Sequence, residues 1–375
     1  MTRKLIFFRL SSLVLGLLIG LVLIELLTRI LFFVGICPSY TAFEFIRQSP
    51  HYVWSQFTGP TFVRKEKIYN FYGNKLRINR YGYRGKAVSP EKKAGASRII
   101  FMGGSQTFDL AAKEGKDWPT LAGNLLNQSA HQVEVLNAGM PGHHSWDCLG
   151  KLYSELYMWK PDVVVINEAW NDIKYFQNLS PENSLMAKNL SSTQISNLNH
   201  SPNHLRVLDL LGWSLNYSKN TLYHPERLPK TNQDRLKNNF SEWGPKQYAL
   251  HLELIYHLCK RINAKLVIMK QPRLVSESNS AEERKTIAYQ WIGLDHTTLI
   301  KAFEACDLEI EKLKTIYPDI SVLDASSIMT GHKEFFIDHV HTTELGSEKL
   351  ASIVAERISP LLSKLPNQNK EKENL

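Results

Sequence analysis

The sequence predicts an α/β fold with a mainly parallel sheet, preceded by one N-terminal transmembrane helix. From Ser97 onward, short β-branched apolar runs alternate with amphipathic segments, a pattern typical of a parallel sheet covered by helices on both faces. A second observation is a long apolar stretch near the N-terminus. The third is an ordinary composition, with 43% hydrophobic and 22% charged residues, which excludes a disordered, collagen-like or multi-span membrane protein.

The alternating region contains five expected strands and five expected helices. Each expected strand is a short run of mainly apolar residues, and each expected helix repeats its apolar residues with the helical period. The strands are expected at 98–102, 132–137, 162–167, 265–270 and 320–323. The helices are expected at 118–126, 148–159, 247–262, 298–316 and 343–362.

The N-terminal segment has the composition of a membrane anchor. An apolar stretch covers residues 10–36 and reaches the roughly 20 residues that a helix needs to cross a bilayer. Positive residues precede it at Arg3, Lys4 and Arg9, and positive flanks stay on the cytoplasmic side. No small-x-small cleavage site lies near residues 34–38. We therefore expect an uncleaved single-pass anchor with its N-terminus inside and the folded domain periplasmic or extracellular.

The chain divides into four expected parts. Residues 1–36 are the cytoplasmic tip and transmembrane anchor, and residues 37–96 are an extracytoplasmic lead-in segment. The main domain is expected at 97–365, with an insertion at about 174–243, and residues 366–375 form a polar tail. The insertion is rich in asparagine and serine, and it is either a functional lid or a mobile excursion without a role in chemistry.

Composition and short motifs exclude several classes of function. Lysine and arginine (45) exceed aspartate and glutamate (36), but no dense basic cluster indicates a nucleic-acid partner. There is no HExxH, no P-loop and no GxGxxG after a strand, so neither a metal nor a cofactor is expected. The cysteines lack CxxC spacing and are expected to be free core residues, with one disulfide as the alternative: Cys37, Cys148, Cys259 and Cys306.

The first expected strand ends in a serine that could carry chemistry. Gly103 and Gly104 precede Ser105 and let the chain turn sharply as it leaves the sheet. Ligands of open α/β sheets bind at the carboxyl ends of the strands, where this serine is expected. The alternative is a serine that caps the following helix, which is a common role.

Two further strand ends carry groups that could donate hydrogen bonds to the same place. Gly139 follows the second strand, and its backbone N–H could be exposed because no Cβ blocks the approach; the alternative is a simple turn. Asn171 follows the third strand and could donate a side-chain N–H. Trp170 is expected to be a wall residue and Asp172 a local turn or cap residue.

Near the C-terminus, Asp338 and His341 are separated by two residues just before an expected helix. That spacing lets one short loop present an imidazole together with a carboxylate that orients it. Adjacent side chains diverge in an extended segment, so His339 is expected to point away from Asp338. His332 lies further upstream, with only Lys333 and Glu334 as close charged neighbours in the sequence.

These four blocks, in this order and each at a strand end, resemble the SGNH (GDSL-like) hydrolase family, in a membrane-tethered bacterial Gly-Gly-Ser variant. The resemblance implies a three-layer α/β/α sandwich with a mainly parallel sheet of about five strands. It covers residues 97–364 apart from the insertion. The roles it implies are nucleophile, base, orienting acid and two oxyanion donors, for Ser105, His341, Asp338, Gly139 and Asn171 respectively.

Two residues depart from the family pattern. Gly104 stands where the family usually has aspartate before the serine, and Ala169 stands where it usually has glycine. The second change is expected to narrow the oxyanion pocket slightly. Neither change removes a reacting group.

The resemblance implies a serine esterase that hydrolyses acyl esters through an acyl-enzyme intermediate and needs no cofactor. Its expected partners are the membrane, through the N-terminal helix, and a substrate that is an acylated saccharide of the cell envelope or a lipid ester. One alternative is an O-acyltransferase acting on an envelope glycan, because water and sugar hydroxyls compete for the same acyl-enzyme. Another is an inactive SGNH scaffold that binds glycan, against which the intact set of reacting residues argues.

Overall fold

The computed structural model describes residues 3–34, 51–55, 58–71, 74–129, 131–177, 179–181 and 236–363. Its centre is a five-stranded sheet with the order β6-β5-β7-β8-β9, in which every neighbouring pair is parallel. The strands are β5 (Ser97–Gly103), β6 (Val133–Asn137), β7 (Val163–Asn167), β8 (Lys265–Lys270) and β9 (Ser321–Asp324). The predicted parallel sheet is therefore confirmed, and each strand overlaps the range expected for it.

Helices cover both faces of this sheet and make a three-layer sandwich. One face packs against α5 (Ser145–Ser154), α10 (Trp243–Arg261) and α13 (His296–Ile316). The other packs against α4 (Trp118–Gln128) and α15 (Glu344–Leu362). Alternate residues of the strands point to opposite faces. Every residue of β7 is buried, and all but its last, Asn167, are apolar, so this strand is covered on both sides.

Shorter helices connect these layers. They are α3 (Ser105–Phe108), η1 (Leu156–Trp159), α6 (Trp170–Phe176), α11 (Ala281–Arg284), α12 (Tyr289–Ile292), α14 (Ser326–Met329) and η4 (Lys333–Phe335). The single helix expected at 148–159 is two elements, α5 and η1. The break lies at Glu155, whose backbone angles (φ −143°, ψ −42°) are not helical. α5 also begins earlier than expected, because the side chain of His144 caps it.

The lead-in segment forms two antiparallel hairpins that pack on the main domain. They pair β1 (Tyr52–Ser55) with β2 (Gly59–Phe62) and β3 (Lys67–Phe71) with β4 (Asn74–Ile78). Apolar side chains of these strands share a buried cluster with Phe108 and Met140. Phe108 ends the short helix that begins at Ser105, so the hairpins support the segment that carries the predicted nucleophile.

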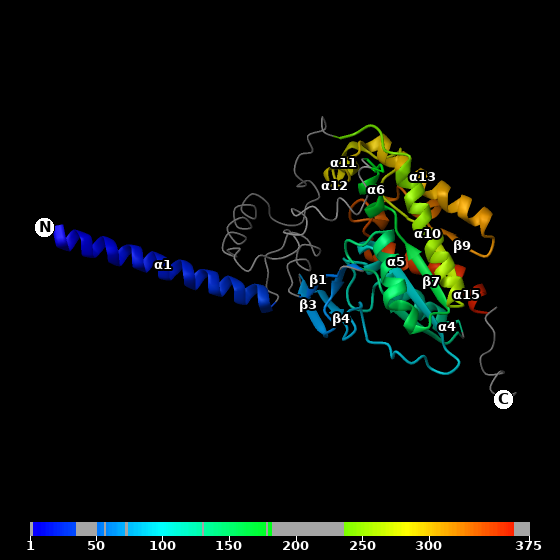
Figure 1. The fold of residues 1–375 in the computed structure, drawn as a ribbon, viewed down its shortest axis with the longest axis horizontal. Helices are drawn as coiled ribbons and strands as arrows, with labels where there is room; N and C mark the ends of the chain where they lie inside the picture. Colours follow the sequence, from blue (N-terminus) through cyan, green and yellow to red (C-terminus); the bar gives the residue numbers. More distant parts are fainter. Residues whose placement is uncertain are drawn as a thin grey trace.

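The N-terminal helix α1 (Arg3–Val34) extends away from the α/β body (Figure 1). Its window Ser11–Thr28 has a mean hydropathy of 2.3 and is long and apolar enough to cross a membrane, although a signal sequence meets the same criteria. Most of its apolar side chains are exposed, as a segment that inserts into lipid requires. The candidate membrane span predicted from the sequence is therefore present.

Two expectations concern cysteines and the insertion. Cys148, Cys259 and Cys306 are free and buried, as expected for core residues, while Cys37 lies outside the described residues. The insertion is described only where α6 ends, at 179–181 and from 236 into α10. The expected lid lies outside the described residues.

Candidate active site

Ser105 lies at the carboxyl end of the central strand β5, as predicted. Gly103 has φ +151°, a conformation open to glycine, and a Cβ there would collide with the backbone of Asn167 and the side chain of Thr107. The chain therefore turns tightly from the sheet into α3, of which Ser105 is the first residue. The backbone N–H of a first helical residue has no partner within its helix.

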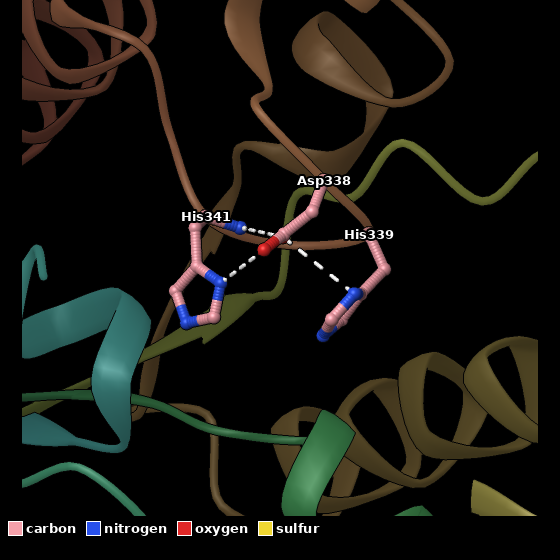
Figure 2. Close-up of side chains that lie close together, drawn as sticks. All are labelled: Asp338, His339 and His341. Atoms are coloured by element: carbon pink, nitrogen blue, oxygen red, sulfur yellow. Dashed lines mark hydrogen bonds and ion pairs between the residues drawn. The ribbon is translucent and has the colours of Figure 1, made fainter. Parts of the chain in front are cut away.

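The structure brings Ser105, His341 and Asp338 together. Ser105 Oγ lies 2.7 Å from His341 Nε2, and His341 Nδ1 lies 2.7 Å from Asp338 Oδ2. The backbone N–H groups of Val340 and His341 donate to Asp338 Oδ1 at 3.1 Å and 3.0 Å. Figure 2 shows the loop folding the His341 ring back onto Asp338, as the two-residue spacing predicted.

Electrostatics fix the protonation of this pair. Burial by itself raises the pKa of Asp338, but the neighbouring His339 and His341 and the hydrogen bonds from His341 lower it below its ordinary value. Burial lowers the pKa of His341, and the Asp338 carboxylate outweighs it and raises that pKa above 6.5. With Asp338 ionised, the neutral His341 carries its proton on Nδ1 and presents the lone pair of Nε2 to Ser105.

The expectation that the His339 side chain points away from Asp338 is wrong. Its Nδ1 lies 3.6 Å from Asp338 Oδ1, so the ring faces the carboxylate instead of pointing away (Figure 2). The cause is that residues 337–340 form a bend and not an extended strand. The ring stacks on Trp170 with 3.9 Å between centroids, which makes Trp170 a wall behind the histidine. Burial lowers the pKa of His339 to about 4, although Asp338 opposes this.

Among the residues that the structure describes, one cluster has the composition of a metal site: Asp338, His339 and His341, whose ligand atoms lie within 4.8 Å of one another. Asp338 and His341 are hydrogen-bonded to each other, and His341 is also hydrogen-bonded to Ser105. That chain of contacts is the geometry of a proton relay. It favours acid–base chemistry at this cluster over metal binding.

The two predicted oxyanion donors lie on either side of the Ser105 turn. Asn171 Nδ2 donates to the carbonyl of His143 at 2.6 Å, and a Cβ on Gly104 would lie 2.6 Å from the same nitrogen. An amide nitrogen has two hydrogens, so one remains for a substrate. Gly139 packs against the backbone of Thr107 and Phe108 with no room for a Cβ. Its N–H donates to Asn137 Oδ1 at 3.1 Å and is buried, so the N–H of Gly139 is not exposed as the sequence suggested.

Asp109 is a site-supporting residue that sequence reasoning missed. It is buried, accepts from the backbone N–H of Trp118, and also accepts from the hydroxyls of Thr342 and Ser347 at 3.1 Å and 2.7 Å. It thereby joins the segment after Ser105 to the segment after His341. No motif marks it, because Thr342 and Ser347 are more than 230 positions away in the sequence.

Asp172 caps a helix, as expected, but that helix comes from a distant part of the sequence. It accepts from the backbone N–H of Ser145 at 3.0 Å and from the Ser145 hydroxyl. The carboxylate therefore caps the start of α5, which belongs to a different part of the chain, instead of its own turn. Ser145 Oγ also lies 2.7 Å from His251 Nδ1. This network anchors Asp172, which directly follows Asn171.

The fold and this contact chain define a parallel α/β protein with a Ser-His-Asp arrangement at the carboxyl edge of its sheet. No protein-family model matches the chain, and no curated protein matches it. Several solved structures do. A lipolytic protein of the G-D-S-L family from Desulfitobacterium hafniense is 11% identical, with 69% of this chain and 98% of that one covered and a TM-score of 0.39.

Two more solved structures are similar to the same degree. A lipase/acylhydrolase from Enterococcus faecalis is 16% identical, with 71% and 96% coverage and a TM-score of 0.40. An acetyl xylan esterase is 13% identical, with 69% and 98% coverage and a TM-score of 0.40. The identities and scores are too low to transfer an activity, so the function is argued from this chain's own residues.

Proposed function

We propose that this protein is a membrane-anchored serine esterase of the SGNH type. The observation that carries the proposal is the continuous contact from Ser105 Oγ through His341 to Asp338, with both heavy-atom distances at 2.7 Å. A serine is a weak nucleophile unless an adjacent base removes its proton, and that base needs a third group to hold it in one tautomer. The three side chains have the distances that these tasks require.

In the proposed reaction, Ser105 Oγ attacks the ester carbonyl carbon while its proton passes to His341 Nε2. The imidazolium that forms is stabilised by Asp338, and it then protonates the leaving alcohol as the acyl-enzyme forms. In the second half, water attacks the acyl-enzyme while His341 takes its proton. The bond to Ser105 Oγ then breaks, His341 returns the proton to that oxygen, and the acid is released. The second amide hydrogen of Asn171 and the N–H of Ser105 stabilise the oxyanion. Gly139 N–H is the third proposed oxyanion donor, and it gives up its hydrogen bond to Asn137 Oδ1 to donate to the substrate oxygen.

The substrate proposed is an O-acyl ester on an envelope glycan or a lipid. A panel of esters with increasing acyl length, assayed on the purified full-length protein, tests the reaction class. The Ser105→Ala variant serves as the control. We expect hydrolysis by the natural protein and none above background by the variant. Equal hydrolysis by both would contradict the proposed nucleophile. A glycan acceptor added to the assay would show whether acyl transfer competes with hydrolysis.

The Asn171→Ala variant is expected to lower kcat on the order of 100- to 1,000-fold, because one oxyanion donor is lost. KM should change little, since the donor acts mainly on charge that develops in the transition state. The measurement is kcat and KM on one ester, with thermal unfolding as a check that the fold is kept. An unchanged kcat would assign Asn171 to structure alone, through its bond to the His143 carbonyl.

We also propose that the α/β domain lies outside the cytoplasm, in the periplasm or beyond the cell. The support is the positive charge of Arg3, Lys4 and Arg9 before the apolar helix. In cells with a permeabilised outer membrane, added protease should degrade the domain while a cytoplasmic marker protein survives. Protection of the domain to the same extent as the marker would reverse the proposed orientation.

A further inference from the structure

Two buried hydrogen-bond acceptors face the Ser105 turn without a donor. Glu168 Oε2 and Gln106 Oε1 have no hydrogen-bond partner among the described residues. A Cβ built on Gly104 would lie 2.9 Å from the first and 3.1 Å from the second, so both oxygens border the space that Gly104 leaves open. Glu168 is 1% exposed and Gln106 is 4% exposed. Buried acceptors without donors are costly.

Exchanging Oε1 and Nε2 by a flip of the Gln106 side-chain amide does not provide the missing hydrogen bonds. Its Nε2 already donates to the carbonyl of Asn167 at 3.3 Å, and exchanging the amide atoms would place an oxygen against that carbonyl. Protonation of Glu168 Oε2 would provide the missing hydrogen bond, because a carboxylic acid has one O–H group that can donate to Gln106 Oε1. One proton then satisfies both oxygens.

The surroundings of Glu168 also favour the protonated form. Burial and the charge of Asp172 raise its pKa well above 4.5, and the facing backbone N–H groups of Gly104, Ala169 and Asn171 only partly oppose this. Of those three groups, Asn171 N–H makes the hydrogen bond, to Oε1 at 3.3 Å. Burial also raises the pKa of Asp172, but its two hydrogen bonds from Ser145 oppose this and favour its ionised form.

Two further titratable groups near Glu168, among the residues that the structure describes, are uncharged side chains. Tyr248, from α10, donates its hydroxyl to the Glu168 backbone carbonyl at 2.6 Å. Cys148, from α5, is buried, and Glu168 is among the groups that raise the pKa of its thiol. An ionised Glu168 would thus face acids and neutral groups, with only backbone dipoles to stabilise it.

We propose that Glu168 is a positioning residue that works as a neutral carboxylic acid. Its O–H donates to Gln106, which follows the nucleophile, and its other oxygen holds the backbone of Asn171. It thereby ties the serine turn to the oxyanion donor. The inference rests on the proposed esterase function. Neutrality is needed for catalysis, because a carboxylate beside Gly104 and Asn171 would oppose the negative charge that develops on the substrate oxygen.

The test compares Glu168→Gln with Glu168→Ala in the purified full-length protein. Glutamine keeps one acceptor for Asn171 and one donor for Gln106, so it reproduces the protonated acid. We expect the glutamine variant to keep kcat within about threefold and the alanine variant to lose on the order of 10-fold or more, with KM nearly unchanged in both. A glutamine variant as impaired as the alanine variant would overturn the proposal.

A second measurement does not depend on esterase activity. An acid whose pKa is higher in the folded state stabilises the fold fully only below its unfolded pKa near 4.5, and that stability is lost as pH rises toward the folded pKa. Glutamine has no such loss. The denaturation midpoint of Glu168→Gln should therefore rise relative to the natural protein as pH increases from about 5. A midpoint difference that is independent of pH would overturn the neutral-acid proposal even if esterase activity were absent.

Discussion

The His341→Ala variant is expected to lose ester turnover by a factor on the order of 10⁶, the size that removal of the nucleophile or base causes in serine hydrolases. Among the described residues, the group hydrogen-bonded to Ser105 Oγ that can take its proton is His341 Nε2, at 2.7 Å, and this variant removes it. The fold should survive, since the ring is near the surface of the site, with 16% of its side chain exposed. The measurement is kcat on one activated ester.

Two neighbouring histidines provide the controls for this variant. His332 is exposed and lies 3.4 Å from Glu334, so His332→Ala should be as active as the natural protein. His339 faces Asp338 but makes no hydrogen bond to Ser105, so His339→Ala should keep most of its activity. An inactive His339→Ala beside an active His341→Ala would show that the base is misassigned.

The second large effect is expected for Asp338→Asn, at about 10⁴-fold in kcat. The amide has nearly the shape of the carboxylate, but its NH₂ group can face His341 Nδ1 and reverse the tautomer, which places a proton on Nε2. That nitrogen could then no longer accept the proton of Ser105. The loss should be smaller than for His341→Ala, because the base itself remains.

The pH profile gives an independent check on the same variant. The base must be neutral, and Asp338 raises the pKa of His341 above 6.5, so kcat/KM of the natural protein should fall as pH drops through that raised value. Without the carboxylate charge, the imidazolium is less stable, and the acidic limb should move to lower pH. A limb at the same pH in both proteins would mean that Asp338 does not act on His341.

The fold was predictable because the strands are buried on both faces. β8 begins and ends at the expected residues, 265 and 270, since a short apolar run flanked by polar residues marks both of its ends. The lead-in hairpins were not expected as strands. Their strands are four or five residues long and mix lysine, asparagine and aromatic residues, so no alternation of apolar and polar residues marks them. Short hairpins of this kind need contacts with a larger domain to be stable.

The candidate site was predictable where one short loop or turn determines geometry. The spacing of Asp338 and His341 predicted their contact, and two glycines predicted the turn before Ser105. The orientation of His339 was not predictable, because it depends on a bend and on stacking against Trp170 from another strand end. The same holds for the role proposed for Glu168, because its proposed partner Gln106 lies in α3 and its pKa depends on burial.

The most direct test of the central claim is covalent labelling of Ser105. The full-length protein would be treated with a fluorophosphonate, digested, and analysed by peptide mass spectrometry. An activated serine should take up one phosphonyl group on the peptide that contains Ser105, at a rate that His341→Ala strongly slows. Absence of labelling, labelling at another serine, or labelling of Ser105 at the same rate without His341 would contradict the proposal that Ser105 is a nucleophile activated by His341 and Asp338.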